Sequence, residues 1–124
     1  MKRERPNQRK SHTVGWETVR ELAQALPEAE ESTSYGTPAF KVAGKLFVRL
    51  HQDGDSIVVR IEPAERAMRM QAVPSAFYIT DHYAAHPWML VRLAHVHRDD
   101  LADILKESWR LRAPKRVLPK HDTE

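Results

Sequence analysis

The sequence predicts a small α+β domain in which helices pack on one face of an antiparallel sheet. Amphipathic helical patterns lie near both ends of the chain, over residues 14–26 and 99–112. Between them, short apolar runs alternate with turn residues, which is typical of a meander of antiparallel strands. The apolar run 88–96 is joined to the last helix by only His97 and Arg98, so this strand and this helix must pack together. A chain of 124 residues has room for one core.

The first helix is predicted over residues 14–26. Its apolar residues recur at helical spacing and form one buried stripe: Val19, Leu22, Ala23 and Leu26. Thr13 is a suitable N-cap and Pro27 ends the helix. The acidic residues that follow, Glu28, Glu30 and Glu31, are expected to lie in a polar loop.

A hairpin is predicted from strands 39–42 and 46–51, with Gly44 in the turn. Side chains alternate between the two faces of a strand, so an odd loop of three residues, 43–45, would keep the apolar residues together. The expected core residues are Phe40, Val42, Leu46, Val48 and Leu50. Lys41, Phe47, Arg49 and His51 would then lie on the opposite face.

The remaining elements follow the same patterns. A third strand over 57–62 directs Arg60 outward, and Pro63 begins a short helix to Gln71 with Met68 as its core contact. Strands over 76–80 and 88–96 complete a sheet of about five strands. The last helix, 99–112, has acidic residues at its start and basic residues at its end. Its buried stripe is Leu101, Ile104, Leu105 and Ser108.

The basic charge is concentrated at the ends of the chain. Residues 1–10 hold five Lys or Arg against one Glu, whereas residues 11–109 hold ten Lys or Arg against fourteen Asp or Glu. We therefore expect a basic N-terminal tail over 1–12, a domain over 13–113 and a polar basic tail over 114–124. Such tails attract polyanions without selecting among them, and they also serve simply as solvated ends.

Several function classes lose support from composition and spacing. The sequence contains no cysteine, and no apolar run approaches the roughly 20 residues that span a bilayer, so we expect a cytoplasmic protein. Pairs His82/His86 and His95/His97 lie at opposite ends of the fifth strand, about 30 Å apart, and cannot share one metal ion. No nucleophile elbow or phosphate-binding glycine loop is present. No enzymatic activity, metal or cofactor is predicted.

Nearly the whole chain, over about residues 13–113, resembles the MmcQ/YjbR family of small bacterial proteins. The motifs are the segment 26–31 after the first helix, the Gly-Thr-Pro-Ala-Phe-Lys-Val hairpin at 36–42, and Tyr83 with His86-Pro87-Trp88. Ser108-Trp109-Arg110 extends the match. The resemblance implies a CyaY-like (frataxin-like) two-layer sandwich with the first and last helices on one face. It also implies DNA binding through a double-wing arrangement of hairpins.

The open face of the predicted sheet supplies the candidate binding residues. Lysine and arginine neutralise phosphates, and aromatic rings stack on unpaired bases. The candidates for contact with nucleic acid are Lys41, Lys45, Phe47, Arg49, Arg60, Trp88 and Arg92. No helix resembles a major-groove reader, so weak sequence specificity is expected. The alternative is a domain that binds a small ligand or a protein through the open sheet face or the Asp81–Trp88 turn.

Overall fold

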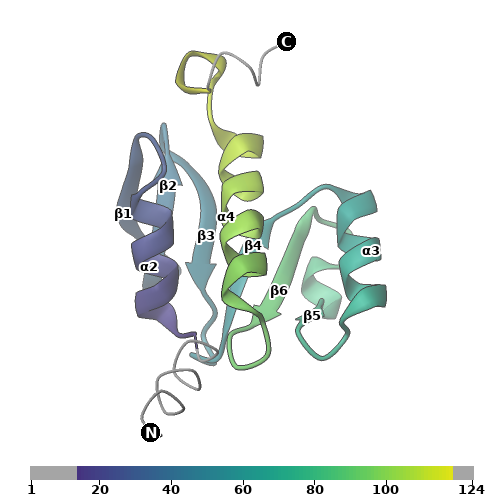
Figure 1. Cartoon of the computed structure of the whole chain (residues 1–124). Helices are drawn as coiled ribbons and strands as arrows, with labels where there is room; N and C mark the ends of the chain where they lie inside the picture. Colours follow the sequence, from purple (N-terminus) through teal and green to yellow (C-terminus); the bar gives the residue numbers. More distant parts are fainter. Residues whose placement is uncertain (1–13, 119–124) are drawn as a thin grey trace, which may run out of the picture.

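The computed structural model describes residues 14–118, which form an α+β domain with a six-stranded antiparallel sheet (Figure 1). The described helices are α2 (Trp16–Gln24), α3 (Pro63–Ala72) and α4 (Arg98–Arg112), with short 3₁₀ helices η1 (Asp81–Tyr83) and η2 (Lys115–Val117). The strands are β1 (Ala29–Ser34), β2 (Thr37–Val42), β3 (Lys45–Leu50), β4 (Ser56–Arg60), β5 (Phe77–Tyr78) and β6 (Trp88–Arg92).

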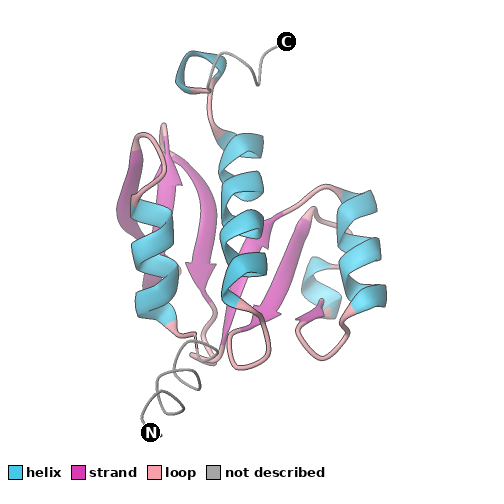
Figure 2. Cartoon of the chain, viewed as in Figure 1, coloured by secondary structure: helices cyan, strands magenta, loops and turns pink. Residues whose placement is uncertain are grey.

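The sheet has the strand order β1-β2-β3-β4-β6-β5. Helices α2 and α4 cross the same face of this sheet, and α3 lies beside its β5 edge (Figures 1 and 2). The core fills the space between the sheet and these two helices, with α4 contributing Leu101, Ile104, Leu105 and Trp109. The predicted arrangement, with the first and last helices on one face, is therefore present.

The sheet contains six strands rather than the predicted five, because residues 29–34 form strand β1 at its edge. We expected Glu30 and Glu31 in a polar loop, but they pair with Lys41 and Phe40 of β2. An edge strand is hydrogen-bonded on one side only and need not bury either face. Its sequence, Ala-Glu-Glu-Ser-Thr-Ser, therefore lacks the alternating apolar pattern that reveals a strand.

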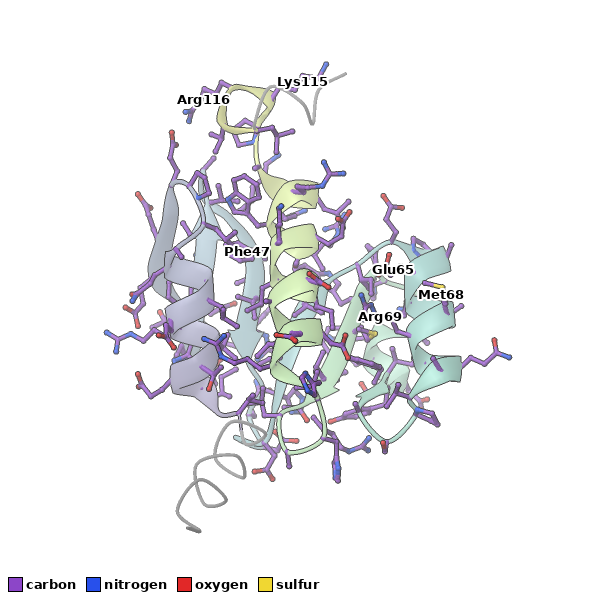
Figure 3. The ribbon with its side chains drawn as sticks, in the orientation of Figure 1. Phe47, Glu65, Met68, Arg69, Lys115 and Arg116 are labelled. Carbon is purple, nitrogen blue, oxygen red and sulfur yellow. The ribbon has the colours of Figure 1, made fainter. Side chains whose placement is uncertain are left out.

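The β2–β3 hairpin corrects two predicted side-chain orientations. The turn has two residues, Ala43 and Gly44, both with positive φ, and Val42 pairs directly with Lys45. A β-bulge then places the extra residue Phe47 between the pairs Phe40/Val48 and Lys41/Leu46. Because the bulge interrupts the alternation, Phe47 and Val48 both enter the core. Phe47 is therefore buried rather than on the outer face, as Figure 3 also shows, and Leu46 takes the outer position.

Strands β3 and β4 separate next to this bulge, and α4 fills the opening. Their pairing covers only Val48/Val59, Arg49/Val58 and Leu50/Ile57. Beyond it, the buried Ser108 hydroxyl donates to the Phe47 carbonyl over 2.6 Å and accepts the Arg60 amide over 2.9 Å. One turn later, Arg112 Nε donates to the Leu46 carbonyl over 3.0 Å. The helix thus satisfies backbone groups that the divided ladder leaves unpaired.

Helix α3 begins at Pro63, as predicted, but it contacts the domain through a different methionine. Met68, the expected core contact, is 59% exposed, whereas Met70 packs against the core. Figure 3 shows Met68 on the side of α3 that is turned away from the sheet. Glu65 and Arg69 lie on the opposite side and form an ion pair at 2.9 Å. The periodicity of this short helix therefore predicted the wrong face.

The chain stays in contact with the domain after α4. Val117 and Leu118 pack against the core, and Arg116 donates to both carboxylate oxygens of Glu28 over 3.1 and 3.2 Å. Figure 3 shows Lys115 and Arg116 beyond the end of α4. At the other end, Gly15 caps α2, and the predicted cap, Thr13, lies outside the described residues.

Candidate functional site

The sheet face opposite α2 and α4, called here the outer face, carries a hollow that we call the outer groove. It consists of two adjoining cavities of about 240 and 340 Å³ that share Tyr35, Arg49, His82 and Tyr83. The first is also lined by Leu46, Val58, His86 and Trp88, and the second by His51, Gln52 and Thr80. The groove therefore lies between the β1–β2 turn and the segment that precedes β6.

Arg49 forms the floor that both cavities share. It is only 4% exposed, and its guanidinium donates to the Tyr83 hydroxyl over 2.8 Å and to the Leu50 carbonyl over 3.2 Å. The same guanidinium lies 5.2 Å from the centroid of the Tyr35 ring. These contacts fix Arg49 between two tyrosines, so its positive charge has a defined place in the groove.

Tyr35 forms one wall of the groove from an unusual backbone position. It lies in the turn between β1 and β2 with φ of 54°, followed by Gly36 with φ of 79°. A bulky residue in this left-handed region costs on the order of 1 kcal/mol, and such costs are concentrated at functional sites. The ring is also 81% exposed, so burial in the core does not explain its presence. Tyr35 is thus a candidate contact for a planar ligand.

The opposite wall is the segment 81–88, which Arg66 of α3 holds in place. The Arg66 guanidinium donates to the carbonyls of Tyr83, Ala84, His86 and Trp88 over 2.7–3.2 Å. Within this wall, the rings of His82 and Tyr83 meet edge to face at 4.7 Å. A single side chain therefore positions the aromatic residues that face Tyr35.

No carboxylate is among the described residues that line the groove, which contain Arg49 and three histidines. Asp53, in the turn before β4, is 3.4 Å from His51 Nδ1. Partial burial of Asp53 acts to raise its pKa, but hydrogen bonds from the Asp55 and Ser56 amides and the contact with His51 lower it overall. The lining thus combines aromatic rings with cationic and neutral donors, a set that favours planar or anionic ligands.

The predicted binding residues occupy different parts of the domain. Arg49 and Trp88 both line the outer groove, and Lys41 and the exposed Lys45 lie on the neighbouring hairpin. Phe47, which is buried in the core, cannot stack on a ligand without unfolding. Arg60 lies 5.5 Å from the Trp88 ring, while Arg92 covers the Tyr78 ring at 3.8 Å and donates to the Ser75 carbonyl.

The three arginines of the outer face therefore do not converge on one point. Arg60 pairs with Trp88 at one end of the β4–β6 ladder, and Arg92 pairs with Ser56 at the other end, about 13 Å away along the strand. Arg92 lines a separate hollow with Asp53, Asp55 and His95. Each arginine instead lies against its own aromatic ring, and only Arg49 contacts two walls of the groove.

Sequence reasoning missed Tyr35 and Arg112 as components of this region. Tyr35-Gly36 is a dipeptide that allows a tight turn with positive φ, and this was the available signal for a hairpin with an exposed ring at its tip. Arg112 reaches the Leu46 carbonyl and lies 5.9 Å from the Trp88 ring. Nothing in the helical pattern indicates this contact, because it depends on the opening between β3 and β4.

Residues 14–118 contain neither a metal-binding cluster nor a membrane-spanning helix. No group of three or more His, Asp or Glu side chains in this range is placed to hold a metal ion, although the rings of His82 and His86 are 6.4 Å apart. In the same range, none of the helices combines the length and apolar character that crossing a bilayer requires.

Fold and groove together define a small α+β domain with helices on one sheet face and an aromatic, cationic groove on the other. A family model described as YjbR matches residues 24–111. This chain belongs to the YjbR family, which confirms the resemblance found in the sequence.

The curated relatives have no described function. The chain is 29% identical over 68 residues to the uncharacterized proteins Mb2600 of Mycobacterium bovis and Rv2570 of Mycobacterium tuberculosis. These alignments cover 52% of this chain and 51% of each relative, so the chain spans about half the length of the curated relatives it matches.

A solved structure has the same fold. The crystal structure of Deinococcus radiodurans protein DR2400, with a domain of the family model DUF419, superposes with a TM-score of 0.71 at 21% identity. The match covers 88% of this chain and 85% of that one. At this identity the likeness establishes the fold alone.

Proposed function

We propose that this protein is a non-enzymatic DNA-binding protein of weak sequence specificity that accepts unpaired bases in the outer groove. The observation that carries the proposal is the composition of that groove: three aromatic rings, Tyr35, Tyr83 and Trp88, and a buried arginine, with no carboxylate in the lining. Family membership is compatible with this role but does not specify it.

Stacking would provide most of the affinity for bases. A base that stacks on an aromatic side chain contributes about 1–3 kcal/mol, and the interaction tolerates any sequence because every base has a π face. The first cavity of the outer groove, at about 240 Å³, is smaller than the usual pocket for a drug-sized ligand and suits a single ring system. The exposed ring of Tyr35 is the wall most accessible to an incoming base.

Electrostatics would provide the attraction to the strand. Lys45 is exposed on the β2–β3 hairpin, Lys41 is half-buried on β2, and the first ten residues of the chain carry five Lys or Arg. Their contribution is sequence-independent and depends on salt. We also propose that the fold is CyaY-like and that hairpins contact DNA in a double-wing arrangement. The turn that carries Tyr35 would be part of one wing. The proposed location is the cytoplasm.

Binding of single-stranded DNA by the full-length chain tests the proposal directly. Fluorescence anisotropy at low salt should show tighter binding to an oligo-dT strand than to a duplex of equal length. Tyr35→Ala should raise the Kd about tenfold, since one stacked base contributes about 1–3 kcal/mol. Tyr35→Phe is the matched control and should retain binding, because it keeps the ring. Equal affinities of Tyr35→Ala and the native chain would reject the groove as the DNA site.

A small planar anion is the second candidate ligand. The specific observation in its favour is that Arg49 is almost fully buried and already bonded to Tyr83, which suits a fixed pocket better than an open strand-binding surface. Such a ligand would use the Asp81–Trp88 turn as its wall. Its affinity would depend weakly on salt for a single charge, whereas binding to a DNA strand should fall steeply between low and moderate salt.

A further inference from the structure

Two arginines from different elements approach the same indole ring at one end of the outer groove. The ζ carbon of Arg60, on β4, lies 5.5 Å from the Trp88 ring centroid, and that of Arg112, on α4, lies 5.9 Å from it. Trp88 lines the first cavity of the outer groove, as does Leu46, whose carbonyl accepts a hydrogen bond from Arg112. The opening between β3 and β4 thus brings the end of α4 to the groove.

Neither guanidinium has an anionic partner in the described range, residues 14–118. Other arginines of the domain do: Arg20, Arg69, Arg98 and Arg116 each lie within ion-pair distance of a glutamate. Two glutamates, Glu65 and Glu107, line a small cavity beside Arg60, but their closest arginine partners are Arg69 and Arg110. Arg60 and Arg112 are therefore two cations beside one indole ring, and neither has a carboxylate of the described residues at 4.0 Å or less.

This arrangement carries an electrostatic cost in the folded protein. Burial, and secondly the positive charge of Arg60, lower the pKa of Arg112. Arginine nevertheless keeps its proton in proteins, so both groups remain charged and repel each other. An anion within reach of both would offset the repulsion and the lost hydration together.

We propose that Arg60 and Arg112 form a binding site for a phosphoryl oxyanion beside Trp88. Planar guanidinium groups match the geometry of phosphate oxygens and can donate two parallel hydrogen bonds each. Arg112 is held by its Nε–H bond to the Leu46 carbonyl, which leaves its terminal amino groups available to a ligand. The phosphate can be free or part of a nucleotide, and in the second case the inference rests on the proposed function, since the base would occupy the adjoining groove.

Inorganic phosphate is the first probe. Calorimetric titration of the full-length chain with phosphate, at constant ionic strength, should show binding. Thermal melting under the same conditions should show a rise in Tm, because a ligand that binds the folded state stabilises it. Arg60→Gln should weaken phosphate binding about tenfold or more, the loss expected for one charge-assisted pair. Arg60 is the preferred position because its side chain makes no hydrogen bond within residues 14–118.

Two further variants separate this site from general charge effects. Arg92→Gln is the matched control, since Arg92 also lies on a ring of the outer face but stands apart from Arg112. It should bind phosphate as the native chain does. Arg112→Lys keeps the charge but loses the planar fork, and it should bind more weakly while remaining folded. Absence of any phosphate effect in the native chain, or an equal loss in Arg60→Gln and Arg92→Gln, would overturn the proposal.

The source of the phosphate is settled by comparing ligands. If a nucleotide supplies it, thymidine monophosphate should bind more tightly than inorganic phosphate or thymidine, and Arg60→Gln should remove that advantage. The slope of log affinity against log salt on single-stranded DNA should then fall by about 0.7 for the lost contact. Tyr35→Ala should weaken DNA binding yet leave inorganic phosphate binding intact. Phosphate binding without DNA binding would retain this site and reject the proposed function.

Discussion

Ser108 and Phe47 are joined by the shortest hydrogen bond between α4 and the sheet among the described residues, from the hydroxyl to the carbonyl over 2.6 Å. The same hydroxyl accepts the Arg60 amide, so one side-chain oxygen connects two strands that have separated. Because Ser108 is fully buried, no water can replace it without rearrangement.

Ser108→Ala is therefore expected to destabilise the domain by about 1–3 kcal/mol, the cost of leaving buried backbone groups unsatisfied. Urea unfolding followed by circular dichroism measures the change. Ser75→Ala, at an exposed serine, serves as the control and should lie within about 0.5 kcal/mol of the native chain. Similar values for the two variants would show that the opening is bridged in another way.

Trp109→Ala should cost about 3–5 kcal/mol, because the indole is 1% exposed and belongs to the core. Trp109→Phe should cost less, since it keeps most of the apolar contact and loses the 2.9 Å bond from Nε1 to the Pro27 carbonyl. Thermal or urea unfolding of both variants checks the order. A nearly neutral Trp109→Ala would contradict the packing of α4 on the first helix and its following turn.

Asp53 should make folding stability depend on acid pH. Its pKa is lowered from the ordinary value of 3.8, so the folded state holds the carboxylate charged more readily than the unfolded state does. This stabilisation is present above about pH 4 and is lost as the pH falls through the lower folded-state pKa. The stability difference between the native chain and Asp53→Asn should therefore shrink below pH 4. A stability difference that stays the same from pH 7 to pH 3 would exclude this role of Asp53.

Arg66→Lys should loosen the wall of the groove without unfolding the domain. A lysine ammonium cannot reproduce the planar set of bonds to the carbonyls of Tyr83, Ala84, His86 and Trp88. Hydrogen exchange should become about tenfold faster at amides of residues 83–88, a local loss of about 1.4 kcal/mol, and stay unchanged in α4. Arg69→Lys, on the same helix, should leave residues 83–88 unaffected; faster exchange there in both variants would assign the effect to α3 as a whole.

The buried faces of α4 and β4 were predictable because their patterns and their environments agree. Leu101, Ile104, Leu105 and Ser108 recur at helical spacing, and all four are buried in α4 as predicted. Ile57 and Val59 alternate in β4 and enter the core. An element that is buried on one side has apolar residues at regular spacing, and this spacing can be recognised in the sequence.

The error in β3 occurs where a local irregularity changes the direction of two side chains. The two-residue turn and the bulge together give the same pairing beyond Phe47 as the three-residue loop that we predicted. Between the turn and the bulge, however, Leu46 lies on the outer face and Phe47 in the core, the reverse of the prediction. The sequence contains no residue that distinguishes the two solutions. Likewise, the groove depends on contacts between segments far apart in the chain, such as Arg49 with Tyr83, and no spacing rule indicates them.

The composition of the two edge strands affects how readily the sheet pairs with a strand of another chain. At one border, β1 presents the exposed charges of Glu30 and Glu31 along a strand without large apolar residues. At the other, β5 is two residues long and lies beside α3. Short, charged or covered borders discourage a second chain from adding its own strand. The polar sequence of β1, which prevented its prediction as a strand, therefore also protects this edge of the sheet against uncontrolled self-association.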